Sequence, residues 1–382
     1  MRISVVLTTY NGSRCLWEQL ESVAAQTRPP DELVARDDGS DDETPAILRE
    51  FAAQASFPVK LELGTFRLGS TPSFERAIGL CTGDIVALCD QDDLWRHDKL
   101  AAIHRVFSDR PEVGLVFSNA ALIDEHGRSL GHTVWDIFNF DARGRWMVRR
   151  RSPPVTLMRF SAPGCAIAYR AEHHHAVLPF PEALRSHDPP MHHDRWILTM
   201  VGAVSETRPL HDPLVSYRLH ADQQVGLGPF FVVGSGFSPW WSAQRMRMRW
   251  GDVVRETGHV LAALPILRRC LVEQRDVSSV AQAVVRLDEF VDHLDFRRRL
   301  PASRLRRVSG VSRAWIRGDY HAYSNGMWSV GADLLRPRAL FPRTGVHVAG
   351  RRRGRNESNA PVARDVLEIA RELSPPAPEA RV

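Results

Sequence analysis

Short apolar runs alternate with amphipathic stretches along the first third of the chain. The runs at residues 3–7, 32–36, 59–63 and 85–88 predict strands. Apolar residues between them recur at three- and four-residue spacing, as in Leu16, Leu20 and Val23, which predicts helices. Strands separated by helices indicate an α/β fold with a parallel sheet, in which ligands bind beyond the carboxyl ends of the strands.

The pattern changes twice further along. Residues 113–117, 164–169 and 215–217 predict strands, and residues 188–200 predict an amphipathic helix. From about residue 230 the pattern is helical and rich in arginine. We therefore expect a first domain over residues 1–228, a helical, basic C-terminal region over 229–348 and a flexible tail over 349–382.

Polar loops follow three of the predicted parallel strands, after residues 7, 36 and 88, and should converge in space. The last begins with the tetrad Asp90-Gln91-Asp92-Asp93. Like charges this close stay ionised together only if a cation or hydrogen bonds offset them. Carboxylates suit a hard divalent cation, Mg²⁺ or Mn²⁺. An acidic turn that caps the next helix is the alternative, and the tetrad alone leaves both open.

Composition is that of a folded protein, with 382 residues, 43% hydrophobic and 25% charged. The net charge is +5, and arginines cluster late, as in Arg297-Arg298-Arg299 and Arg351-Arg352-Arg353. This clustering favours either an anionic partner or surface or simply a solvated face. No nucleic-acid module is recognisable, so no nucleic-acid partner is expected.

Five scattered cysteines fit a reduced, cytoplasmic protein, and no stretch is long enough to span a membrane. We expect a cytoplasmic location, with peripheral contact to the inner face of the cell membrane through the basic C-terminal region.

The motifs, in their order, resemble those of the family 2 glycosyltransferases, which are inverting enzymes of the GT-A fold. The first are Thr8-Thr9-Tyr10-Asn11, Gln26-Thr27, Asp37-Asp38-Gly39-Ser40-Asp41 and the tetrad. Later motifs are similar to the rhamnosyltransferase-like branch. They are Asp90 to Trp95 with Lys99-Leu100, His193-Asp194-Arg195-Trp196, and Tyr217-Arg218-Leu219-His220 with Gly226.

The resemblance covers roughly residues 2–226. It implies a GT-A domain with a mixed, mainly parallel sheet, a donor half over about 1–110 and an acceptor half over about 111–228.

For a nucleotide-sugar donor, the resemblance implies that Thr8 and Tyr10 flank the base, with Tyr10 offering a stacking face. Asp38 accepts a hydrogen bond from the base, while Arg67 contacts the nucleotide. The alternative for the Asp38 segment is a turn with a helix cap, and both can hold.

The diphosphate needs charge neutralisation, because a divalent ion stabilises the charge that builds on the leaving group. The resemblance makes Asp92 the direct metal ligand and Asp90 a contact to the ribose or to the metal. Gln91 occupies a variable position of the motif and implies little. For Asp93 both a role in the site and a simple helix cap stay open.

Inversion requires a base on the face opposite the leaving group, and Asp194 matches that position. Such a base typically contributes about 10² to 10⁴ in rate. Its alternative is a helix N-terminal carboxylate stabilised by the helix dipole. The neighbouring His193 orients Asp194 or touches the acceptor. Arg218 pairs with phosphate and His220 lies near the diphosphate or metal, or both are solvated groups at a strand end.

The resemblance implies a glycosyltransferase that moves a sugar from a nucleoside-diphosphate donor, dTDP-L-rhamnose by similarity to this branch, to a hydroxyl of a saccharide or lipid-linked saccharide. The expected setting is polysaccharide and cell-envelope synthesis. A sugar nucleotidyltransferase is one alternative, but the loop after the first strand lacks the glycines it would need. A non-catalytic nucleotide-sugar-binding module is the other, and the intact Asp92 and Asp194 disfavour it.

Overall fold

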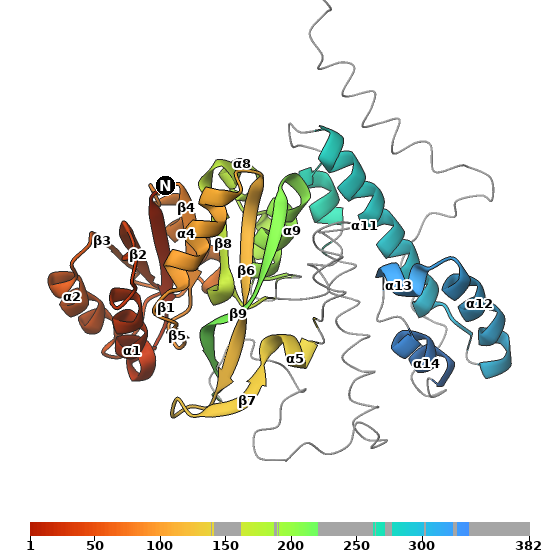
Figure 1. Ribbon diagram of the computed structural model, residues 1–382, viewed down its shortest axis with the longest axis horizontal. Coiled ribbons are helices and arrows are strands. Elements are labelled where there is room, and N and C mark those ends of the chain that lie inside the picture. The colour runs from red at the N-terminus through yellow and green to blue at the C-terminus, as the bar shows by residue number, and fades with distance from the viewer. Residues whose placement is uncertain are drawn as a thin grey trace, which may run out of the picture. The chain divides into compact units, whose positions relative to one another are not determined.

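The computed structural model divides into two compact units, Met1–Ser238 and Pro239–Val382 (Figure 1). The structure describes residues 1–138, 140, 162–186, 189, 191–220, 263, 265–271, 277–301, 303–323 and 327–335. The predicted tail at 349–382 and the predicted boundary at 228/229 lie outside these residues.

A strand–helix alternation builds the first part of unit 1. Its elements are β1 (Ile3–Thr9), α1 (Ser13–Ala24), β2 (Glu32–Asp37), α2 (Thr44–Gln54), β3 (Val59–Leu63), α3 (Ser70–Gly79), β4 (Ile85–Cys89), β5 (Leu94–Trp95) and α4 (Lys99–Asp109). Every residue of β1, β2 and β4 is buried, as expected of central strands covered on both faces. This confirms the predicted parallel α/β pattern.

Long strands and short helices make up the rest of unit 1. They are β6 (Val113–Ile123), β7 (Ser129–Thr133), α5 (Val134–Phe138), η1 (Gly164–Ala166), β8 (Ile167–Arg170), η2 (Ala171–His173), α8 (His174–Val177), η3 (Glu182–Arg185), α9 (His193–Val204) and β9 (Glu206–Arg218).

One mixed sheet of nine strands joins these described elements, in the order β3-β2-β1-β4-β8-β6-β9-β5, with β7 on β6 (Figure 1). The strands β1 to β4 pair in parallel, so their carboxyl ends share one edge. The strand β8 is antiparallel to both β4 and β6. The N-terminal end of β8, with η1 directly before it, therefore lies toward the edge where β4 ends.

The strands β6 and β9 are longer than predicted. They pair in parallel from Val113 with Glu206 to Ile123 with Arg218, with register shifts near Ser118 and Asn119. The sequence predicted only residues 113–117 and 215–217, because polar and proline residues interrupt the apolar pattern. Pairing along the whole length supplies the backbone hydrogen bonds that those residues do not signal locally.

Unit 2 is helical where it is described. Its helices include α11 (Val277–Arg298), α12 (Arg304–Ile316), α13 (Asp319–Tyr323) and α14 (Met327–Leu335). A small core gathers Leu300, Val311, Ala314 and Tyr320. The helical character predicted for this region is thus present, and no described helix is both long and apolar enough to cross a membrane.

Candidate active site

The loops after β1 and β2 are fastened to each other. Thr9 Oγ1 donates to Asp37 Oδ1 at 2.8 Å, and the other oxygen of Asp37 accepts the backbone N–H groups of Gly39 and Ser40. Asn11 Oδ1 accepts the N–H of Asp41 at 3.0 Å. The predicted convergence of these loops is confirmed, and Asp37 is the residue that closes the second loop into a turn.

Asp38 holds a third loop against the first two. Its carboxylate is buried and accepts the N–H groups of Leu68 and Gly69, at 2.9 and 2.7 Å, and the hydroxyl of Ser73 at 2.7 Å. Both oxygens are therefore engaged with the segment that precedes α3. The predicted contact between Asp38 and the base stays a prediction, and the geometry gives Asp38 a positioning role as well.

Tyr10 and Arg67 form a flat pair at the mouth of these loops. The guanidinium carbon of Arg67 lies 4.1 Å from the centroid of the Tyr10 ring. Thr8 is buried within β1 opposite Arg36. The structure thus brings together two of the residues predicted to contact the nucleotide, and presents planar groups suited to stacking on a base.

Gln91 ties the tetrad to the first loop. Its Oε1 accepts the N–H of Tyr10 at 2.8 Å, and its Nε2 donates to the carbonyl of Tyr10 at 3.1 Å. A side chain on Gly12 would collide with this amide. The sequence suggested little for Gln91, so this is a site residue that motif matching missed. Only the absence of a side chain at position 12 hinted at it.

The three carboxylates of the tetrad point to different partners. Asp92 Oδ2 lies 2.7 Å from His220 Nε2, while Asp90 Oδ2 accepts the N–H of Cys165 at 3.2 Å. Asp93 Oδ1 accepts the N–H of Arg218 at 2.9 Å. The helix-cap reading of Asp93 is wrong, because α4 begins at Lys99 and its N-cap position is Asp98.

Burial and mutual repulsion dominate the electrostatics of this cluster. Burial first, and then the charges of Asp92 and Asp194, raise the pKa of the Asp90 carboxyl. Burial, and then the charges of Asp92 and Asp90, raise the pKa of the Asp93 carboxyl as well. Both shifts indicate carboxylates that lack enough positive charge around them.

Lys99 supplies part of the missing charge from behind the cluster. It is fully buried, donates to the carbonyl of Cys165 and lies 3.4 Å above the centroid of the Trp95 ring. Burial lowers the pKa of Lys99 to about 8, although the neighbouring Asp93 and Asp90 oppose this shift. A buried lysine here therefore supports the carboxylates without reaching the solvent-facing side of the site.

The donor set fits a hard divalent cation. Oxygen atoms of Asp90 and Asp93 and the sulfur of Cys165 lie within 4.8 Å of one another. Asp93 Oδ2 is buried and has no hydrogen-bond partner among the described residues. Burial and the neighbouring carboxylates keep the pKa of the Cys165 thiol high, so carboxylate oxygens are the better donors. The clustering thus includes Asp93, which the sequence left out of the predicted metal ligands.

Gly164 brings the tetrad next to the N-terminus of α9. A Cβ atom at this position would lie 3.5 Å from Asp90 Oδ2, 3.8 Å from Asp194 Cβ and 3.1 Å from His193 Nε2. Asp194 lies in the first turn of α9 and accepts the N–H of Arg195 at 2.6 Å. Asp90 and Asp194, which are far apart in sequence, therefore both lie close to Gly164.

His193 is buried beside this space. Its ring stacks on Phe74 with centroids 3.8 Å apart and planes 20° apart. Neither ring nitrogen has a hydrogen-bond partner among the described residues. Burial lowers the pKa of His193 to about 4, so the ring is neutral near pH 7.

Arg218 is buried behind the tetrad. Its side chain is 2% exposed, and its guanidinium donates to the carbonyls of Asp92 and Glu125 and to the carboxylate of Glu18. This buried guanidinium fastens the tetrad loop to β9 and α1, and its predicted contact with phosphate stays a prediction. His220 contacts Asp92, and its predicted place near the diphosphate or metal stays a prediction too.

Residues 4–165 match the protein-family model described as Glycosyl transferase family 2. The matched residues include Thr8, Tyr10, Asp38 and the tetrad, whereas Asp194 lies beyond them. This part of the chain is therefore similar to glycosyl transferase family 2.

Curated relatives match the same part of the chain. A Nostoc protein named as an uncharacterized glycosyltransferase is 33% identical over 130 residues, which are 34% of this chain and 40% of that protein. An uncharacterized protein of Mycobacterium tuberculosis is 32% identical over 127 residues, 33% of this chain and 37% of that protein. The chain therefore matches about two fifths of the length of these relatives.

Solved structures resemble the chain more distantly. Staphylococcus aureus TarS in complex with UDP-GlcNAc has a TM-score of 0.46 and 16% identity, covering 89% of this chain and 90% of that one. A Pyrobaculum calidifontis mannosyltransferase in complex with GDP-Man and Mn²⁺ has a TM-score of 0.46 and 20% identity, covering 89% and 81%. Both TM-scores are below 0.5, so the likeness to family 2 rests on the match of residues 4–165.

Proposed function

We propose that this protein is an inverting glycosyltransferase that moves a sugar from a nucleoside-diphosphate donor to a hydroxyl acceptor. The observation that carries the proposal is the convergence around Gly164. Asp90, from the tetrad, and Asp194, in the first turn of α9, both lie close to Gly164, and the charge of Asp194 acts on Asp90. The family 2 match of residues 4–165 supports the donor half of the proposal.

The base of the donor stacks on the pair formed by Tyr10 and Arg67, in which the guanidinium carbon lies 4.1 Å from the ring centroid. Asp38 and Gln91 act by positioning this pair, because they fix the backbones of the loops that carry it. Motif resemblance favours dTDP-L-rhamnose as the donor and a saccharide or lipid-linked saccharide as the acceptor.

Asp92 and Asp90 would hold a Mg²⁺ or Mn²⁺ ion, with Asp93 close by. Such an ion stabilises the negative charge that develops on the departing nucleoside diphosphate. His220 orients Asp92 through their 2.7 Å contact. Arg218 keeps the loop in place from behind, through the carbonyl of Asp92.

Asp194 acts as the general base. It takes the proton of the acceptor hydroxyl while the acceptor oxygen bonds to the anomeric carbon, and the bond from that carbon to the diphosphate oxygen breaks on the opposite face. The electron pair of the broken bond leaves with the nucleoside diphosphate. The geometry thus supports a single displacement with inversion, for which no nucleophilic residue is required.

Asp194→Asn tests the assignment. We expect sugar transfer to fall by about 10² to 10⁴-fold, because the amide cannot accept the proton, while donor affinity stays within about two-fold. Turnover and donor-induced thermal stabilisation, with and without Mn²⁺, measure the two effects for a panel of nucleotide sugars. Parent-like turnover in Asp194→Asn would remove Asp194 from the base role.

The same panel separates the alternatives. A nucleotidyltransferase would release pyrophosphate from a nucleoside triphosphate and a sugar phosphate. A non-catalytic binding module would be stabilised by a nucleotide sugar without consuming it. Transfer or hydrolysis of one donor, with no pyrophosphate release, is the outcome that we expect.

A further inference from the structure

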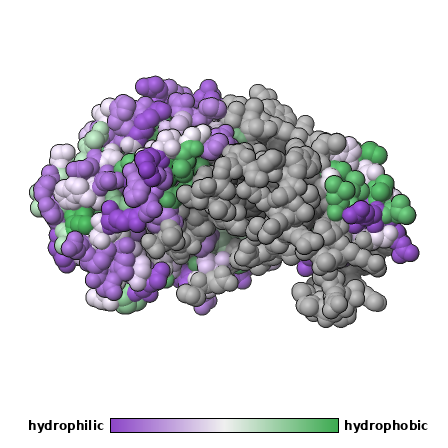
Figure 2. Space-filling model, turned by 90° about the horizontal axis from the view of Figure 1, so that it is seen from below, coloured by the Kyte–Doolittle hydropathy of each residue, from purple (hydrophilic) through white to green (hydrophobic). Residues whose placement is uncertain are grey.

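The helix α12 of unit 2 exposes large aliphatic side chains. Leu305 is 87% exposed, Ile316 is 81% exposed and Val308 is 48% exposed. At 3.6 residues per turn these three lie on one face of the helix, away from the buried Val311 and Ala314. Figure 2 shows green apolar atoms beside purple polar ones at this end of the molecule. Ser309 and Ser312 interrupt this apolar strip between Val308 and Ile316, and exposed apolar patches of this kind mark interaction sites.

Positive charge flanks this strip. The sequence of α12 contains four arginines and no acidic residue. Within the described part of unit 2, Arg304, Arg306 and Arg313 form no ion pair with a carboxylate. Aliphatic side chains bordered by uncompensated guanidinium groups are the pattern of a helix that lies in the interface of an anionic membrane.

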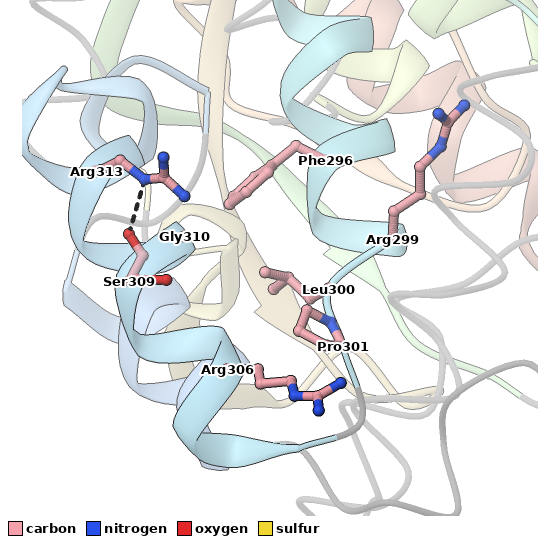
Figure 3. A pocket seen from close by; sticks show the side chains of 8 residues that line it. All are labelled: Phe296, Arg299, Leu300, Pro301, Arg306, Ser309, Gly310 and Arg313. Atoms are coloured by element: carbon pink, nitrogen blue, oxygen red, sulfur yellow. Dashed lines mark hydrogen bonds between the residues drawn. The ribbon is translucent and has the colours of Figure 1, made fainter.

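A pocket of about 300 Å³ opens beside the same helix, between the end of α11 and α12 (Figure 3). Phe296 and Leu300 point into it and give it an apolar floor, while Arg299, Arg306 and Arg313 border it. The guanidinium groups of Arg299 and Arg306 extend outward from it. Arginines at the rim of an apolar hollow suit an anionic headgroup attached to a hydrocarbon chain.

We propose that α12 and this pocket form a docking surface for an anionic phospholipid bilayer. The aliphatic strip enters the headgroup region, and Arg306 and Arg313 meet lipid phosphates. A nucleic acid would satisfy the arginines but leave Leu305 and Ile316 in water. A bilayer satisfies both. This surface lies in unit 2 and does not depend on the proposed sugar transfer.

Vesicle co-sedimentation of the full chain tests the proposal. We expect binding to vesicles of phosphatidylcholine with phosphatidylglycerol and little binding to phosphatidylcholine alone, with loss of binding as salt is raised. The double variant Arg306→Glu/Arg313→Glu should weaken binding at least about ten-fold, because each arginine near the surface contributes about 1 kcal/mol. The triple variant Leu305→Ser/Val308→Ser/Ile316→Ser should weaken it similarly.

The matched control is Arg49→Glu/Arg105→Glu, which changes the net charge equally at two exposed positions of unit 1. It should bind like the parent, and thermal melting should show that all variants fold. Three outcomes overturn the proposal. They are that the parent does not bind vesicles with phosphatidylglycerol, that the α12 variants bind like the parent, or that the control loses binding as strongly as the α12 variants.

Discussion

At the scale of single residues, His193 departs furthest from an ordinary environment. A buried polar atom without a partner costs about 1–3 kcal/mol, and His193 has two such nitrogens among the described residues. Its Nε2 faces the Gly164 backbone between Asp90 and Asp194. A neutral ring at this point can exchange hydrogen bonds with a sugar or acceptor hydroxyl, which would relieve the cost only in the complex.

His193→Phe should preserve the stack on Phe74 while removing both nitrogens. We expect the free protein to keep or slightly raise its melting temperature, since two unsatisfied groups are lost. The rate of sugar transfer should fall about ten-fold or more, because the variant loses one hydrogen bond to the substrate. Calorimetry and steady-state kinetics measure the two effects, and unchanged kinetics would reduce His193 to a packing residue.

The same residue predicts a pH dependence of stability. Its pKa is about 4 in the folded protein and about 6.5 when unfolded, so the unfolded chain binds the proton more tightly. The contribution of His193 to the free energy of unfolding is fully present above pH 6.5. It falls by up to about 3 kcal/mol as the pH drops toward 4. Urea unfolding at several pH values should show this loss in the parent, and His193→Phe should lack it.

At the scale of elements, the loop before α3 depends on Gly39. This glycine has φ of +79°, and a Cβ there would lie 2.9 Å from the backbone carbon of Phe66. Asp38, beside Gly39, lies in the loop after β2, and Arg67, beside Phe66, lies in the loop after β3, so both residues lie where these two loops touch. The turn after β2 therefore sets where Arg67 meets Tyr10.

Gly39→Ala should displace residue 66 and pull Arg67 away from Tyr10. We expect the donor KM to rise about ten-fold with a smaller change in kcat, and the unfolding free energy to fall by about 1–2 kcal/mol. Gly79→Ala is the control, because nothing lies within 4 Å of the added Cβ at the end of α3. Equal kinetics in the two variants would contradict the role of the loop.

At the scale of the whole molecule, the two units have separate cores. In unit 2 the buried Asp333 accepts hydrogen bonds from the guanidinium of Arg297, at 2.7 and 3.1 Å, and from the hydroxyl of Tyr320 at 2.7 Å. These contacts join α11, α13 and α14. The contacts that shape the donor loops all lie in unit 1.

Asp333→Asn should destabilise unit 2 by about 3 kcal/mol, because a buried guanidinium loses its counter-charge. The donor KM should stay unchanged if the units fold separately, and urea unfolding with kinetics on the same samples measures both. The control Asp295→Asn removes ion pairs whose side chains are more exposed, so it should lower the free energy of unfolding by less than about 1 kcal/mol. A change of donor KM in Asp333→Asn would show that the units are coupled.

Much of the fold was predictable where local signals were strong. The apolar runs of β1, β2 and β4 identified central strands, and the polar residues that follow them identified the edge that carries the site. The full lengths of β6 and β9 were not predictable, because their polar segments are stabilised by pairing with each other. The candidate site shows the same limit of local signals. The motifs pointed to Tyr10 and Asp92, but not to the residues that form hydrogen bonds with them.

The sequence by itself determined the α/β class and the edge of the sheet at which the polar loops meet. These follow from apolar periodicity and from motifs that are local in the chain. Only the tertiary structure decided that Gln91 and Asp38 position loops, that Arg218 is buried behind the tetrad and that Gly164 separates Asp90 from Asp194. Such roles depend on contacts between residues far apart in sequence, and no local pattern records them.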